Sequence, residues 1–206
     1  MHGKVALLAF EVFDNLACDK LVVSPSGSAK QAFVELRADG SRAELYRDVA
    51  DASILRCLEL WLATHPPPAD RPYGFVLWLP TRAYEFLERA KRLFGADVEL
   101  LIADFDALPS TNAVGVNAPV IQRNAIGAAG ATDTIQTFGD PLRAPVGTVD
   151  IMFETSFAFL RRCLARDDVV IEKHSAFLRR FAPDMPRSMR DFYPNMSVLR
   201  TERSVS

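Results

Sequence analysis

Three residues near the start of the chain have the types and spacing to bind a metal ion that acts on a phosphate group. Asp19 precedes one apolar run, and Glu35 and Arg37 close a second run after the turn SPSGS. Alternate residues of a strand share a face, so Glu35 and Arg37 should point to the same side. Carboxylates on two paired strands can bind one hard cation such as Mg²⁺ or Mn²⁺, which polarises a phosphate and activates water. A carboxylate at the end of an apolar run needs a partner for its negative charge, and a salt bridge between Glu35 and Arg37 is the alternative to a metal ion.

The elements that must position these residues begin with a hairpin. Residues 4–13 and 20–25 are rich in β-branched and aromatic side chains and predict strands, and 29–37 predicts the returning strand. Ser41 stands three residues before Glu44, which is the spacing of a capping box. We therefore expect a helix over about 42–63, packed on the sheet.

Two further strands are predicted with a helix between them. The apolar runs at 73–80 and 97–105 predict buried strands, and 82–94 predicts a helix that Thr81 caps and Gly95 ends. Helices between apolar strands indicate parallel crossovers, whereas the hairpin is antiparallel. The expected fold class is therefore α/β, with one mixed (α+β) sheet and a helical C-terminal part.

This order of elements is similar to that of the PD-(D/E)xK nuclease superfamily. The matching residues are Asp19, fifteen intervening positions and VELR, which contains Glu35 and Arg37, within residues 4–104. The resemblance implies a restriction-endonuclease-like core acting, or once acting, on nucleic acid phosphodiesters. It also implies a metal ion at Asp19 and Glu35, with Glu11 as the upstream acid. The superfamily normally has Lys at position 37, and because Arg cannot act as a base we expect weak or absent cleavage.

Two other functions stay open. A noncatalytic protein-binding module of the immunity, adaptor or inhibitor type would fit Arg37 and the acidic main body. A metal-dependent phosphotransferase or glycosyltransferase could use Asp104 and Asp106, because acids at the end of an apolar strand can bind metals.

Composition restricts the partners and the compartment. The net charge is −2, with +4 over 155–206 and −6 over 1–154, so the basic C-terminal part suits an anionic partner such as nucleic acid or an acidic protein, and it also fits plain solvated helix faces. The three cysteines are far apart and predict free thiols in a reducing, cytoplasmic setting, and the three histidines have no zinc-site spacing. No apolar run is long enough to span a bilayer, and neither a signal peptide nor a membrane partner is expected.

The expected organisation has three parts that form one domain. Residues 1–108 make the α/β core, 109–147 an irregular connection rich in Gly, Ala and Pro, and 148–206 a helical part packed on the core. Short strands around Val120 and Ile135 could lie in the connection.

Overall fold

The chain packs into two compact units, each built from segments that are far apart in the sequence. The first unit comprises residues 1–16, 82–108 and 154–206, and the second comprises 17–81 and 109–153. The predicted boundaries at 108 and 147 stay a prediction, because packing units do not test which segments fold alone. The structure, a computed structural model, describes residues 5–68, 71, 73–95, 98–125, 134–145 and 147–202.

The first unit contains a four-stranded sheet with the order β1-β6-β11-β10. Its strands are β1 (Ala6–Phe10), β6 (Glu99–Phe105), β11 (Met196–Thr201) and β10 (Val169–Lys173). β1 and β6 are parallel, whereas β11 is antiparallel to both β6 and β10. Leu100, Ile102 and Leu199 are buried, so the central strands are apolar on the face that they share.

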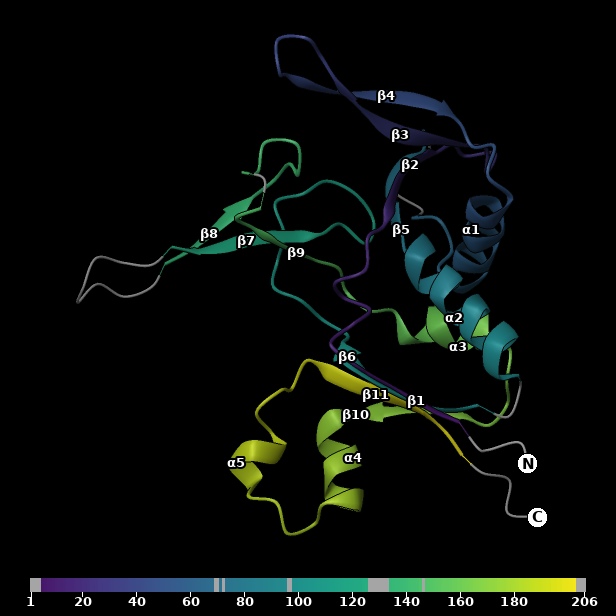
Figure 1. The fold of residues 1–206 in the computed structure, drawn as a ribbon, viewed down its shortest axis with the longest axis vertical. Helices are drawn as coiled ribbons and strands as arrows, with labels where there is room; N and C mark the ends of the chain where they lie inside the picture. The colour runs from purple at the N-terminus through teal and green to yellow at the C-terminus, as the bar shows by residue number, and fades with distance from the viewer. Residues whose placement is uncertain are drawn as a thin grey trace. The chain divides into compact units, whose positions relative to one another are not determined.

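Helices cover both faces of this sheet (Figure 1). α2 (Thr81–Phe94) and α3 (Phe157–Leu164) lie on one side, and α4 (His174–Phe181) and α5 (Arg187–Arg190) lie on the other. α2 buries Ala83, Leu87 and Ala90, which are spaced as one helical face. Gly95 ends α2 as predicted, since it has φ +76° and its N–H donates to the Lys91 carbonyl.

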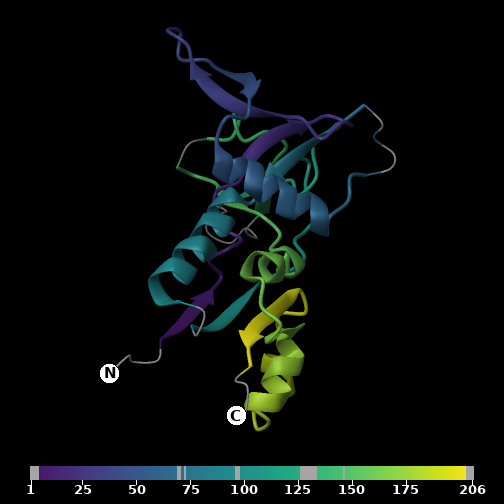
Figure 2. The ribbon, with the colours of Figure 1, turned by 90° about the vertical axis from the view of Figure 1, so that its right-hand side faces the viewer.

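The second unit contains an antiparallel sheet with the order β4-β3-β2-β5. Its strands are β2 (Asp19–Val23), β3 (Ala29–Leu36), β4 (Arg42–Asp48) and β5 (Phe75–Leu79). The predicted hairpin of β2 and β3 is confirmed. α1 (Ala52–Thr64) runs along this sheet and packs against β5 (Figure 2). Its buried residues Ile54, Cys57, Leu58 and Trp61 form the apolar face that its spacing predicts.

The helix predicted over 42–63 is wrong in its first part. Residues 42–48 form β4, whose Arg42 pairs with Leu36 of β3. The Ser41 carbonyl accepts from the Arg37 N–H and closes the turn between these strands, so the expected capping box does not form. The helix starts after Asp51, whose carboxylate accepts from the N–H groups of Ser53 (2.7 Å) and Ile54. Pairing with β3 therefore outweighs the local helical pattern.

The expectation of a single mixed sheet is also wrong. β5 belongs to the sheet of the second unit and β6 to the sheet of the first. β5 pairs antiparallel with β2, and its other edge is bound by Val116, whose N–H donates to the Val76 carbonyl (2.8 Å). A short, buried apolar run shows that both faces are covered, but it does not identify the partner strands.

Two strands of a small sheet with the order β8-β7-β9 lie in the predicted irregular connection, and the third strand, β9, follows it. Its strands are β7 (Val120–Ala125), β8 (Thr134–Phe138) and β9 (Asp150–Met152), so the short strands expected around Val120 and Ile135 are confirmed. The helix expected from 148 instead starts after Ser156, which accepts from the Phe159 N–H (3.2 Å). Within the described residues, no helix has the length and apolarity to cross a membrane.

Candidate functional site

The residues predicted from the hairpin are only partly brought together. The predicted salt bridge is confirmed, because Arg37 Nε lies 3.4 Å from Glu35 Oε2, with both side chains about half exposed. Asp19 Oδ1 instead accepts a hydrogen bond from Gln31 Nε2 (2.9 Å). Glu11 belongs to the other packing unit. A catalytic role for Asp19, Glu35 and Arg37 stays a prediction.

No metal centre is visible in the part of the chain that the structure describes. There, no group of three or more His, Cys, Asp or Glu side chains could hold an ion. Glu35 neutralises its charge with Arg37 at the surface, so the compensation that suggested a metal ion is supplied by an ordinary ion pair.

A different set of acids gathers at the carboxyl ends of the parallel strands β1 and β6. Glu11 follows β1 with φ 51°, and its N–H donates to the Ala103 carbonyl of β6 (3.0 Å). Asp104 lies near the end of β6 and Asp106 directly follows it. The turn after Glu11 brings Asp14 to Asp104. In open α/β sheets, this end of the parallel strands is where ligands bind.

Asp104 and Asp14 form a buried carboxyl pair. Asp104 is fully buried, and its Oδ2 accepts from the N–H groups of Phe13 (2.8 Å) and Asp14 (3.4 Å), while Oδ1 accepts from its neighbour Phe105 (2.8 Å). Burial raises the pKa of Asp104, although these backbone donors act in the opposite direction. Burial and the charge of Asp104 raise the pKa of Asp14 to about 6. Below this pKa the protonated Asp14 carboxyl can donate to Asp104, and the N–H groups of Phe13 and Asp14 hold the turn after β1 on the end of β6.

Asp106 lies in a second, more open group of polar side chains. Its Oδ2 accepts from Lys173 Nζ (2.5 Å) and from the Ser197 hydroxyl. Its Oδ1 is buried and has no hydrogen-bond partner among the described residues, and the same holds for Thr155 Oγ1. Since buried polar atoms are normally satisfied, these two oxygens mark places where a water molecule or a ligand would complete the hydrogen bonding.

Glu154 belongs to the same group. The N–H of Thr155 donates to the Phe105 carbonyl (2.9 Å), which ties the segment that contains Glu154 to the end of β6. Burial, followed by the negative charge of Asp106, raises the pKa of the Glu154 carboxyl. Because the residue as a whole is exposed, this carboxyl combines raised basicity with access from solvent.

The strand-end acids were only partly predictable. Asp104 and Asp106 were identified from their place after an apolar run, although for a different chemistry. Asp14 has a similar signal, since it follows the apolar run of β1 by a few residues. Glu154 and Thr155 carry no such signal, because only the folded chain brings them to the end of β6.

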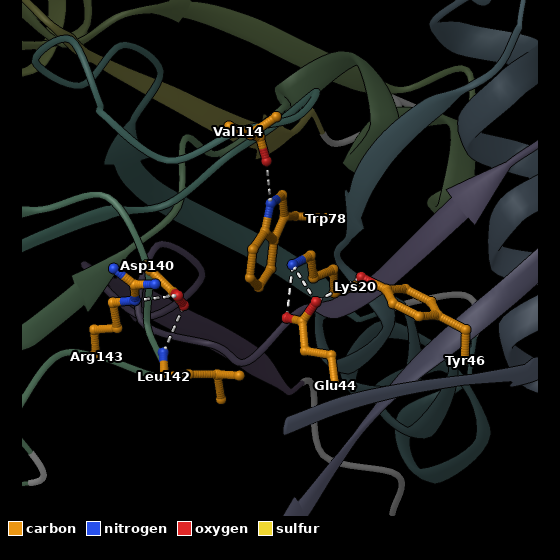
Figure 3. A network of polar contacts seen from close by, with 8 residues as sticks. All are labelled: Lys20, Glu44, Tyr46, Trp78, Val114, Asp140, Leu142 and Arg143. Carbon is orange, nitrogen blue, oxygen red and sulfur yellow. Dashed lines mark hydrogen bonds and ion pairs between the residues drawn. The ribbon is translucent and has the colours of Figure 1, made fainter. Parts of the chain in front are cut away.

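A separate polar network holds the β3–β4 hairpin in the second unit (Figure 3). Lys20 Nζ donates to both carboxylate oxygens of Glu44 (2.6 and 2.8 Å) and lies 5.4 Å from the centre of the Trp78 ring. Tyr46 Oη also donates to Glu44 (2.5 Å). Burial raises the pKa of Tyr46 to about 12, and this hydrogen bond contributes. Each charge here is matched within the network, which favours a structural role.

Two solved structures from Burkholderia thailandensis have a similar fold. One is an uncharacterized protein of the COG1565 superfamily, with a TM-score of 0.61 and 15% identity, covering 100% of this chain and 57% of that chain. The other is a member of that superfamily bound to S-adenosyl-homocysteine, with a TM-score of 0.61, 14% identity and coverage of 100% and 55%. The chain thus spans little more than half the length of these neighbours. No curated protein matches it.

A family model described as "Putative S-adenosyl-L-methionine-dependent methyltransferase" matches residues 2–173. This match corrects the resemblance to PD-(D/E)xK nucleases, together with the nuclease function and the Mg²⁺ or Mn²⁺ cofactor that it implied. The protein-binding module and the phosphotransferase or glycosyltransferase are not favoured either. The VELR letters fit that nuclease motif because any half-exposed hairpin strand can alternate apolar and charged residues. Since the match covers most of the sequence, the chain belongs to the Methyltransf_28 family.

Proposed function

We propose that this chain takes part in methyl transfer from S-adenosylmethionine and that the reaction takes place at the carboxyl ends of β1 and β6. Family membership and the S-adenosyl-homocysteine in a structural neighbour support the reaction class. The observation that carries the choice of site is the pair of buried, unpartnered oxygens, Asp106 Oδ1 and Thr155 Oγ1, beside Glu154.

The residues at this site fit the cofactor. S-adenosylmethionine carries an ammonium group and ribose hydroxyls, which are hydrogen-bond donors, and a positive sulfonium, which acids stabilise. Asp106 and Thr155 offer acceptors for such donors, and the surrounding carboxyls provide a negative environment. When bound, the cofactor supplies an electrophilic methyl group.

The chain's own residues would then remove the proton that the methyl acceptor releases. As the acceptor atom bonds to the methyl carbon and the bond from that carbon to sulfur breaks, the acceptor must release a proton. Glu154 is suited to take it, because its pKa is raised and its carboxyl is reachable. Lys173 holds Asp106 in place, and the Asp14–Asp104 pair fixes the adjoining turn.

Binding of S-adenosyl-homocysteine tests the site. Calorimetric titration of the full chain should detect binding, and Asp106→Asn and Thr155→Val should weaken it by about 10-fold, the effect of losing one hydrogen bond to a buried group. Asp184→Asn is the control, because Asp184 is an exposed acid of the same unit. Absence of binding, or equal affinity of the wild type and Asp106→Asn, would contradict the proposed site.

Glu154→Gln tests the proton acceptor. With radiolabelled S-adenosylmethionine and the proteins and metabolites of a cell extract as acceptors, the substitution should slow methyl transfer by about 10²-fold or more. Wild-type activity should rise with pH through the raised pKa of Glu154, because only the ionised carboxyl accepts a proton. Glu59→Gln, an exposed change in α1, is the matched control. Equal rates for Glu154→Gln and the control would exclude Glu154 as the base.

A further inference from the structure

We propose that a polar cavity in the second unit binds a small monocarboxylate with an apolar body, of which 3-phenylpropanoate is a simple example. The cavity has a volume of about 620 Å³ and lies between the start of β4 and the segment 140–145. Its walls include Arg42, Glu44, Asp140, Leu142 and Arg143, and Figure 3 shows all of these except Arg42. This site goes beyond the proposed methyl transfer and does not depend on it.

The two acids of the walls already have cationic partners. The Glu44 carboxylate is paired with Lys20 Nζ and also accepts from the Tyr46 hydroxyl. Asp140 Oδ2 lies 3.5 Å from Arg143 Nε. Because one cation matches each carboxylate, these acids do not create a site for a cationic ligand. The same two carboxylates would repel a doubly charged anion, such as a phosphate monoester, more strongly than a singly charged one.

Arg42 is the cation of the walls that remains without an ion pair in the part of the chain that the structure describes. Its Nη1 donates to the Leu142 carbonyl (3.4 Å), which places the guanidinium against the segment 140–145. The residue is exposed and lines the cavity, so its other N–H donors are reachable from solvent. Two parallel N–H groups of a guanidinium match the two oxygens of a carboxylate. A carboxylate therefore supplies the missing charge and fits the donors.

Apolar side chains beside Arg42 favour a carboxylate that carries an apolar group. Leu36 of β3 pairs with Arg42, so the two side chains share one face of the sheet, and Leu36 is 72% exposed. Val34 pairs with Glu44 on the same face and is 59% exposed. An aromatic or aliphatic group attached to the carboxylate would remove part of this surface from water. The volume lies within the range of about 300–1,000 Å³ that is typical of small-molecule sites.

Two-dimensional ¹H–¹⁵N NMR of the full chain tests binding and its location. Titration with 3-phenylpropanoate should shift the Arg42 Nε–H and Leu142 amide signals and leave those of α4 in the first unit unchanged, with a Kd on the order of 1 mM. 3-Phenylpropanamide has the same body without the charge and should bind about 10-fold more weakly. Phenyl phosphate, as the dianion, should also bind more weakly. Absence of shifts at Arg42 and Leu142, or equal or tighter binding of the amide or the phosphate, would overturn the proposal.

Variants of β4 test the part that Arg42 takes in binding. Arg42→Gln removes the charge and should weaken binding of 3-phenylpropanoate by about 10-fold, to the level of the amide. Arg42→Lys keeps the charge but loses the paired donors, so its affinity should be intermediate. Arg47→Gln is the matched control, because Arg47 lies on the opposite face of the same strand, 5.3 Å from the centre of the Phe33 ring. A preference for the carboxylate that persists in Arg42→Gln, or an equal loss in Arg47→Gln, would refute the role of Arg42. Unchanged amide signals of α1 report that each variant is folded.

Discussion

Replacing Asp14 with Asn should stabilise the folded chain near neutral pH, although it removes a group from the most buried part of the candidate site. Asp14 is only 2% exposed and lies against Asp104. Asn keeps the size and the oxygen that accepts from Asn15 Nδ2 (2.7 Å). Its amide can donate to Asp104 at every pH, whereas the Asp14 carboxyl donates only while protonated.

The sign and size follow from the pKa of Asp14. Burial and the Asp104 charge raise it from an ordinary value of 3.8 to about 6. The folded state therefore binds more protons than the unfolded state between these values. The stabilisation is fully present below about pH 4 and is lost as pH rises through about 6. At about 1.4 kcal/mol for each pH unit, the loss is up to about 3 kcal/mol. Asp14→Asn avoids it, so we expect a gain of about 1–3 kcal/mol near pH 8 and little change near pH 4.

Urea unfolding at a series of pH values measures this effect. The wild type should lose stability between about pH 4 and 7, and Asp14→Asn should show a smaller loss, with the remainder due to Asp104. Asp184→Asn, a change to an exposed acid, should follow the wild-type curve. If Asp14→Asn is destabilised equally at both ends of the range, or keeps the full wild-type slope, the buried carboxyl pair does not share a proton.

Two further predictions concern the second unit. Gly74→Ala should cost about 3 kcal/mol or more in urea unfolding, because Gly74 has φ +104° and a Cβ there would lie 2.5 Å from the Val23 carbonyl oxygen. Gly27→Ala, with φ +84° and no atom within 4 Å of the added carbon, should cost only about 1 kcal/mol, and similar costs for both would refute the clash. Glu44→Gln should lower the pKa of Tyr46 from about 12 towards its ordinary 10.0, because the Glu44 carboxylate accepts a hydrogen bond from the phenol hydroxyl. Ultraviolet titration of the phenolate measures this, Glu59→Gln is the control, and an unchanged pKa would show that burial alone raises it.

The local elements were largely predictable, whereas their assembly was not. Short-range signals located the β2–β3 hairpin and the end of α2 at Gly95. They failed at 42–48, where a capping-box pattern gave way to pairing between β4 and β3. Propensity describes the preference of an isolated segment for helix or strand. A neighbouring strand with unpaired N–H and C=O groups adds hydrogen bonds that favour the strand.

The choice of sheet partners lay beyond local reasoning. β5 and β6 are both buried apolar runs separated by one helix, and this arrangement favours a parallel pair. In the structure, β5 completes an antiparallel sheet with β2, and β6 pairs parallel with β1. The sequence contains the apolar character of each strand, but the partner depends on contacts between segments far apart in the chain.

The candidate site shows why a short sequence motif and the sheet topology select different residues. The chain leaves the first unit after residue 16, returns at 82, leaves again after 108 and returns at 154. The acids at the end of β1, at the end of β6 and at Glu154 are therefore separated by segments of the second unit. Asp19, Glu35 and Arg37 lie on two strands that a hairpin joins. Their closeness in the sequence therefore reflects the short hairpin connection. In a chain that alternates between two units, sequence proximity marks local structure, and the chemistry is better sought where parallel strands end side by side.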